Sequence, residues 1–102
     1  MYRAAYYGNL NQIILLKEKG CPLTEKLCTI AAKYNHIHIL EWAIENNCPW
    51  NEDVCSYAAY NGRFDTLKWA RERGCPWNKY TCLKYAIKYQ NNAARDWIIS
   101  EQ

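Results

Sequence analysis

The sequence lacks long hydrophobic runs and any strong excess of charge. Its longest run of large aliphatic residues covers only residues 13–16, whereas a membrane-spanning helix needs about 20 apolar residues. No apolar segment typical of a secretory signal follows the N-terminus. The 13 Lys and Arg residues against 10 Asp and Glu residues give a net charge of +3, and no basic tail stands out. We therefore expect no membrane partner, and the small net charge disfavours nucleic acid as a partner.

The sequence also lacks the motifs that mark enzymes and cofactor sites. It contains no glycine-rich phosphate loop, no nucleophile elbow and no zinc-protease motif. His36 and His38 are two residues apart at the start of an expected helix, so their side chains diverge and do not share a metal. Adjacent carboxylates such as Glu52 and Asp53 usually balance the dipole of the helix they open. The prediction is a protein that is not an enzyme, with no catalytic residue, no metal site and no cofactor.

What the sequence does contain is a period of 27 residues. The step relates three Cys-Pro pairs, which begin at Cys21, Cys48 and Cys75. Two further sets follow the same step, namely the cysteines Cys28, Cys55 and Cys82 and the alanines Ala5, Ala32, Ala59 and Ala86. Trp97 follows Trp69 by 28 residues, so the last block carries one inserted residue. A fixed period over nearly the whole chain is the signature of a repeat array.

The period divides the chain into blocks of one repeat domain, residues 1–102. We expect a partial repeat at 1–19, full repeats at 20–46 and 47–73, and a last repeat with the inserted residue at 74–102. Each block begins with a segment that ends the preceding helix: a left-handed residue is expected at Gly20, at Asn46 or Asn47, and at Gly74. The proline that follows prevents the helix from resuming.

Each block then predicts two short helices joined by a tight turn. The first helix is expected to begin after an N-cap oxygen on Thr24, Asn51 or Asn78. The turn before the second helix is marked by Gly8, Asn35 or Gly62. Helices this short are marginal alone in water, and no period-2 alternation indicates strands. The prediction is an all-α fold, an α-solenoid in which helix-turn-helix repeats stack on one another.

Six cysteines in so short a chain raise the question of disulfides or metal binding. Within a block the spacing is Cys-x6-Cys, whereas zinc pairs have about two to four intervening residues. Equivalent cysteines in adjacent blocks are expected about 8–10 Å apart, and a disulfide needs Cα atoms within about 7 Å. A disulfide between Cys48 and Cys55 is left open. The favoured interpretation is free thiols in a reducing, intracellular setting, with Cys28, Cys55 and Cys82 buried on helices and the others beneath loops.

The five tryptophans are expected to pack in the core. Three belong to the apolar stripe of the second helices, namely Trp42, Trp69 and Trp97. The other two, Trp50 and Trp77, follow a proline and are expected to wedge between successive loops. A core role is favoured over ligand contact for all five.

The repeated motif GCPW…C…AA…NGRFDTLKWARERGCPW resembles the ankyrin repeat, and in particular the shortened Cys-Pro-Trp ankyrin repeats of giant viruses of amoebae. The resemblance covers about residues 4–99. Ankyrin repeats run to about 33 residues, and the blocks here are shorter, so no β-hairpins are expected. The resemblance implies that the chain binds a protein partner. If the source is viral, it also implies that the partner is a host protein and that the chain is located in the host-cell cytoplasm.

Three positions on the first helices vary between blocks, whereas the packing positions recur. In the ankyrin family this helix face lines the concave groove, so the resemblance implies that these positions contact a partner. They are rich in tyrosine, whose rigid ring provides contact area at low entropic cost. The candidate partner-binding residues are Tyr6, Tyr7, Ile30, Lys33, Tyr34, Tyr57, Tyr60, Lys84 and Lys88. A plainer interpretation is that some tyrosines only bury their rings between repeats.

The function predicted from these observations is a non-catalytic protein–protein interaction scaffold. Two alternatives are left open. One is an RNA-binding α-solenoid, in which tyrosines stack on bases and lysines neutralise phosphates. The other is a structural fragment of a longer array, which would self-associate through uncapped ends.

Overall fold

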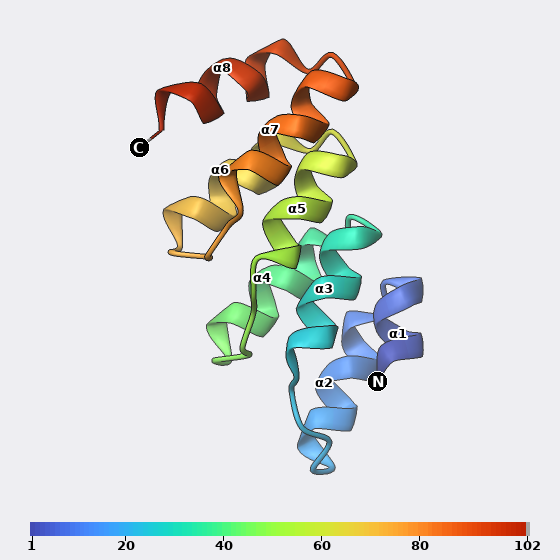
Figure 1. Cartoon of the computed structure of the whole chain (residues 1–102). Helices are drawn as coiled ribbons and strands as arrows, with labels where there is room; N and C mark the ends of the chain where they lie inside the picture. Colours follow the sequence, from blue (N-terminus) through green and yellow to red (C-terminus); the bar gives the residue numbers. More distant parts are fainter. Residues whose placement is uncertain (102) are drawn as a thin grey trace. The chain divides into compact units, whose positions relative to one another are not determined.

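The computed structural model describes residues 1–101, which contain eight α-helices and no β-strand (Figure 1). The all-α prediction is confirmed. None of the helices in these residues is long and apolar enough to cross a membrane. The helices are α1 (Tyr2–Tyr7), α2 (Leu10–Glu18), α3 (Glu25–Lys33), α4 (Ile37–Glu45), α5 (Asp53–Tyr60), α6 (Phe64–Glu72), α7 (Lys79–Lys88) and α8 (Asn92–Ser100).

The chain forms two compact units, Met1–Trp50 and Asn51–Gln102. In the first unit, α1 pairs with α2, α3 pairs with α4, and α1 lies beside α3 (Figure 1). In the second unit, α5 pairs with α6, α7 pairs with α8, and α5 lies beside α7. Each unit therefore contains two helix pairs whose first helices are neighbours.

The turns within the helix pairs adopt the left-handed backbone that the sequence indicates. Gly8, Asn35 and Gly62 have φ angles of 76°, 61° and 71°. The next backbone N–H closes each turn; for example, His36 donates to the carbonyl of Ala31 at 2.8 Å. In the last block this conformation falls on Gln90 (φ 56°). The extra residue of that block is thus taken up at the end of α7, which has 10 residues where α5 has 8.

The segments between helix pairs also follow the expected pattern. The left-handed residues are Gly20 (φ 97°), Asn47 (φ 62°) and Gly74 (φ 83°), each directly before a cysteine. This backbone reverses the chain after a helix, and glycine or asparagine adopts it with little strain. The predicted helix stops are confirmed.

The three expected N-caps behave differently. Asn78 accepts a hydrogen bond from the Thr81 N–H through Oδ1 at 3.1 Å, as an N-cap should. Asn51 accepts a hydrogen bond from the Asp53 N–H at 2.9 Å, at the start of α5. This donor is two residues along the chain, whereas the donor to Asn78 is three residues along. Thr24 is the N-cap residue of α3, as predicted, but its side chain makes no capping hydrogen bond; its hydroxyl lies 2.7 Å from the Tyr2 hydroxyl instead. The predicted N-cap position at Asn51 is wrong by one residue, because Glu52 is the N-cap of α5.

Small and aliphatic side chains fill the two cores. Ile13, Leu27, Ile39 and Leu40 are fully buried in the first unit, and Leu67 and Ile98 are fully buried in the second. Alanines occupy the helix faces that meet, which lets neighbouring helices approach closely. All the described tryptophans are half-buried, so the prediction that they are core residues holds only in part. The ring centroid of Trp77, for example, lies 5.7 Å from that of Trp97 and 4.7 Å from Cζ of Arg71, at the edge of the core.

All six cysteines are free thiols. Cys28, Cys55 and Cys82 are fully buried, as predicted, and so is Cys75; Cys48 is 5% exposed and Cys21 is half-buried. The sulfur that contacts Cys48 belongs to Cys28, in the preceding block, at 3.4 Å. The close sulfur contact therefore joins two blocks, whereas the pair that the sequence left open, Cys48 and Cys55, lies within one block.

Candidate interaction surface

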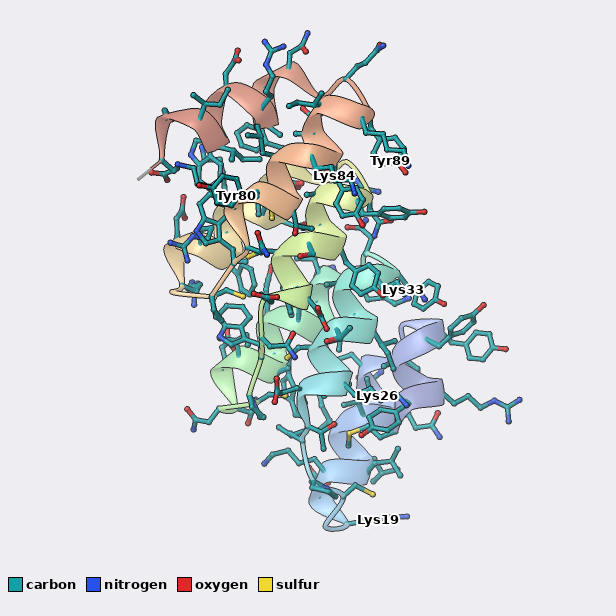
Figure 2. All side chains as sticks on the ribbon, in the orientation of Figure 1. Lys19, Lys26, Lys33, Tyr80, Lys84 and Tyr89 are labelled. Carbon is teal, nitrogen blue, oxygen red and sulfur yellow. The ribbon has the colours of Figure 1, made fainter. Side chains whose placement is uncertain are left out.

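Two grooves hold most of the candidate partner-binding residues, one in each unit. The N-terminal groove is a hollow of about 490 Å³ between the neighbouring helices α1 and α3. Its lining residues are Tyr2, Arg3, Tyr6, Tyr7, Lys26, Ile30, Lys33 and Tyr34. Lys26 and Lys33 project from α3, one near each end of the helix (Figure 2). The groove is thus open to solvent along the length of α3.

Aromatic rings form a connected cluster at one end of the N-terminal groove. The ring of Tyr6 contacts that of Tyr34 at 4.6 Å and that of Tyr7 at 4.9 Å between centroids. Both contacts are edge-to-face, the arrangement that the charge distribution of aromatic rings favours. Tyr7 is 68% exposed, Tyr6 48% and Tyr34 40%. The rings are therefore held by one another, and each still leaves a substantial part of its surface accessible to a ligand.

The cations of this groove lie over its rings. Lys26 Nζ is 4.8 Å from the centroid of the Tyr2 ring, and Lys33 Nζ is 5.5 Å from that of Tyr34. Arg3 adds a third positive charge to the lining. Among residues 1–101, no carboxylate lines this groove. The N-terminal groove is therefore both aromatic and basic.

Contacts beneath the groove fix α1 against α3. The Nε2–H of His36 donates to the carbonyl oxygen of Tyr6 at 2.9 Å. The Tyr2–Thr24 hydroxyl contact links the other end of α1 to the start of α3. A Cβ atom added at Gly8 would lie 2.8 Å from the His36 ring, so the turn packs closely on that histidine. These contacts hold the groove in shape without a ligand.

The C-terminal groove lies between α5 and α7 and has a volume of about 320 Å³. Tyr60 packs edge-to-face on Tyr85 at 5.3 Å and on Tyr89 at 5.6 Å. The charges in the lining are Glu52 and Asp53, and no cation lines the groove within residues 1–101. Its full lining is Glu52, Asp53, Ser56, Tyr57, Tyr60, Thr81 and Tyr85. The two grooves share tyrosines and differ in the sign of their charge.

The structure brings most of the candidate residues together within each unit. Five of them line the N-terminal groove: Tyr6, Tyr7, Ile30, Lys33 and Tyr34. Tyr57 and Tyr60 line the C-terminal groove. Lys84 and Lys88 are exposed on α7 but line neither groove, and Lys88 Nζ lies 5.5 Å from the Tyr89 ring.

Several groove residues were missed because only positions one repeat apart were compared. Lys26, Ile30 and Lys33 are spaced i, i+4, i+7, which places them on one face of a helix. Glu52, the N-cap of α5, and Ser56 and Tyr60 on that helix are spaced i, i+4, i+8 and also share one face. The helical period along each first helix therefore contained the signal for the residues at the start of both grooves.

Two other hollows are less suited to a partner segment. One, of about 670 Å³, lies between α1 and α2 and is lined mainly by small or polar side chains such as Ala4, Asn9 and Gln12. Another, of about 350 Å³, follows one face of α6 between Phe64 and Glu72. Neither contains a cluster of exposed rings.

The buried thiols show perturbed acidity. The hydrogen bond from Cys28 lowers the pKa of Cys48. In the second unit, the hydrogen bond from Cys55 likewise lowers the pKa of Cys75. Burial raises the pKa of Cys82 to about 12. Within residues 1–101, no group of three or more His, Cys, Asp and Glu side chains is arranged to hold a metal ion.

Comparison with protein-family models, with curated protein sequences and with solved structures finds no match to this chain.

Proposed function

We propose that this protein is a non-catalytic protein–protein interaction module whose helix pairs are ankyrin-like repeats of an α-solenoid. The partner protein binds the tyrosine-rich face of the first helices. The observation that carries the proposal is the gathering of exposed tyrosines into the two grooves, each between neighbouring first helices. Exposed aromatic rings held by their neighbours bind at low entropic cost and are common at interface hot spots.

The chemistry of the grooves supports binding over catalysis. The N-terminal groove presents rings, cations and Ile30, and its tyrosine hydroxyls have no adjacent base to activate them. The resemblance to shortened viral ankyrin repeats adds a further element to the proposal, that the partner is a host protein in the host-cell cytoplasm. On this proposal the protein acts by presenting a preformed surface.

The test is quantitative capture of partners from a eukaryotic cell lysate with three forms of the chain. These are the wild type, the double variant Tyr6→Ala with Tyr34→Ala, and the control Tyr80→Ala. Tyr80 is 84% exposed and lines neither groove, so the control removes a more accessible ring elsewhere. We expect the double variant to capture about tenfold less, or even less than that, of a partner that the wild type captures. The control should capture the wild-type amount. A far-ultraviolet circular dichroism spectrum confirms that all three forms are folded.

Other outcomes would replace the proposal. Equal retention of the partner by all three forms would show that the tyrosine cluster is not part of the interface. Recovery that disappears after nuclease treatment or in modest salt would favour the RNA-binding alternative. If sedimentation finds only concentration-dependent self-association, the chain would be a structural fragment that binds further repeats.

A further inference from the structure

The N-terminal groove has a charge pattern that restricts its ligand. Its three cations come from both walls, Arg3 from α1 and Lys26 and Lys33 from α3, and no carboxylate in the lining opposes them. A ligand that brings carboxylates would be attracted and oriented by these groups, whereas a basic ligand would be repelled. The groove thus favours negatively charged ligands.

The aromatic part of the groove adds an apolar requirement. Ile30 lies between the two lysines along α3, and the rings of Tyr6 and Tyr34 pack together at the end of the groove near Lys33. Such a surface gains free energy by covering apolar side chains. A purely polar anion would leave these rings unused, so the ligand should alternate carboxylates with apolar groups.

The spacing of the lysines suggests a spacing in the ligand. Lys26 and Lys33 are seven residues apart on one helix, which corresponds to about 10 Å along the axis at roughly 1.5 Å per residue. A peptide in the extended polyproline II conformation has three residues per turn and rises about 3.1 Å per residue, so its positions i and i+3 lie on one face, about 9 Å apart. Two carboxylates at positions i and i+3 of such a segment would therefore face the two lysines.

We propose that the N-terminal groove binds an extended acidic peptide segment of a partner protein, with carboxylates at Lys26 and Lys33 and apolar side chains on the tyrosine cluster. This inference rests on the proposed function and names the chemistry of the partner. The C-terminal groove has similar tyrosines but carries Glu52 and Asp53. It therefore serves as an internal contrast, because the same peptide should not bind there.

A peptide fits the groove better than a nucleic acid does. A bound polynucleotide brings a phosphate with every nucleotide and gains affinity with each one that is neutralised. The groove supplies three cations within one hollow of about 490 Å³, and the whole chain has a net charge of only +3. An acidic peptide needs only two or three charge contacts and uses the rings for the remainder.

The test is selection of random 12-residue peptides by phage display on the immobilised full chain. We expect wild-type selections to be enriched in Asp and Glu three residues apart, with apolar residues between them. The charge-reversal variant Lys26→Glu with Lys33→Glu should lose this enrichment. The matched control Lys17→Glu with Lys19→Glu makes the same change in net charge on exposed residues outside both grooves, and should keep it.

A labelled synthetic copy of a selected peptide then gives affinities by fluorescence anisotropy. We expect about tenfold weaker binding to the Lys26/Lys33 variant and an unchanged affinity for the control. Equal loss in both variants, neutral or basic selected peptides, or no enrichment would overturn the inference. Displacement of the peptide by an equal concentration of a 12-nucleotide oligouridylate would assign the groove to RNA.

Failure of this inference is distinguishable from failure of the proposed function. If acidic peptides do not bind, yet the Tyr6→Ala and Tyr34→Ala variant still loses a lysate partner, the interaction module stands and only the charge assignment fails. If acidic peptides do not bind and the Tyr6→Ala and Tyr34→Ala variant retains every lysate partner of the wild type, both proposals fail.

Discussion

The sulfur of Cys28 donates a hydrogen bond to the sulfur of Cys48 across 3.4 Å, in the interior of the first unit. The two residues are 20 positions apart, and Cys48 lies in the loop that follows the helix pair of Cys28. Cys55 and Cys75 are also 20 positions apart in the sequence. In the second unit, the hydrogen bond between these two cysteines lowers the pKa of Cys75. The loop cysteine has a lowered pKa in both units.

We expect mild oxidation to join Cys28 to Cys48. A disulfide bond is about 2.05 Å long, so the two sulfurs need to approach by little more than 1 Å. Diamide, a small azo oxidant, accepts the two electrons and two protons that the thiols release. Proteolysis under non-reducing conditions followed by mass spectrometry should identify the Cys28–Cys48 peptide pair.

The variant Cys28→Ala provides the control for this oxidation. It should remove that cross-link without creating another to Cys48. Cys21 is half-buried and its sulfur contacts no other sulfur among residues 1–101, so diamide should leave it available for alkylation. Cross-links that occur only between molecules, or that join Cys21 first, would contradict the observed sulfur contact.

The buried thiol of Cys82 predicts a loss of stability at alkaline pH. Burial raises its pKa to about 12 from an ordinary value of 9.0. A group with a raised folded-state pKa stabilises the fold fully below its unfolded pKa, and this contribution is lost as pH rises toward the folded pKa. The free energy of unfolding should therefore fall between pH 9 and pH 12.

Comparison with Cys82→Ala isolates this contribution. The variant has no thiol to ionise, so its urea-unfolding free energy should fall less steeply than that of the wild type between pH 9 and 11. Every other ionisable group is present in both proteins, so its effect on the two curves is the same. Identical slopes would show that Cys82 ionises in the folded protein as readily as in the unfolded one.

Substitution of Gly8 should destabilise the protein more than substitution of Gly62. Both residues have a positive φ, so an alanine at either position costs roughly 1–2 kcal/mol. At Gly8 the new Cβ would also lie 2.8 Å from the His36 ring, whereas nothing lies within 4 Å at Gly62. Displacement of the ring would weaken the hydrogen bond to the Tyr6 carbonyl, adding about 1 kcal/mol.

Urea titration of Gly8→Ala and Gly62→Ala measures this difference. We expect the midpoint to fall for both and to fall further for Gly8→Ala. Equal midpoints would mean that the histidine ring moves aside without cost. The comparison also reports on the N-terminal groove, because His36 holds the end of α1 that carries Tyr6 and Tyr7.

The local structure could be predicted wherever one residue type determines the backbone. Gly8 and Asn35 marked their turns because few other residues tolerate a left-handed backbone. Thr24 lies at the predicted N-cap position, but its side-chain hydrogen bond goes to the Tyr2 hydroxyl, which only the folded first unit brings near. The contact between Cys28 and Cys48 depends on how a loop returns across its helix pair, and spacing alone does not encode that path.

The sequence could identify some of the residues that line the grooves, but not all of them. Comparison of positions one repeat apart found Tyr6 and Lys33, because variable surface positions stand out against recurring packing positions. Lys26 required the helical period along α3 as well. The charge difference between the grooves emerged only once the structure showed which side chains share a hollow, since Lys84 carries a charge yet lies outside both.

Gln90 is the one turn residue within the helix pairs that is neither glycine nor asparagine, and it predicts a stabilising substitution. Its φ angle of 56° places a long side chain in the left-handed region, where most residues are strained by roughly 1–2 kcal/mol. Gln90→Gly should raise the free energy of unfolding by about 0.5–1 kcal/mol, because part of the relieved strain is offset by the greater entropy of unfolded glycine. Asn35→Gly is the matched control: asparagine already tolerates φ of 61°, so we expect a smaller gain. Urea unfolding of both variants beside the wild type measures the two effects. An equal gain at both positions would mean that glutamine is no more strained than asparagine in this turn, and a loss at Gln90 would show that its side chain contributes contacts that outweigh the strain.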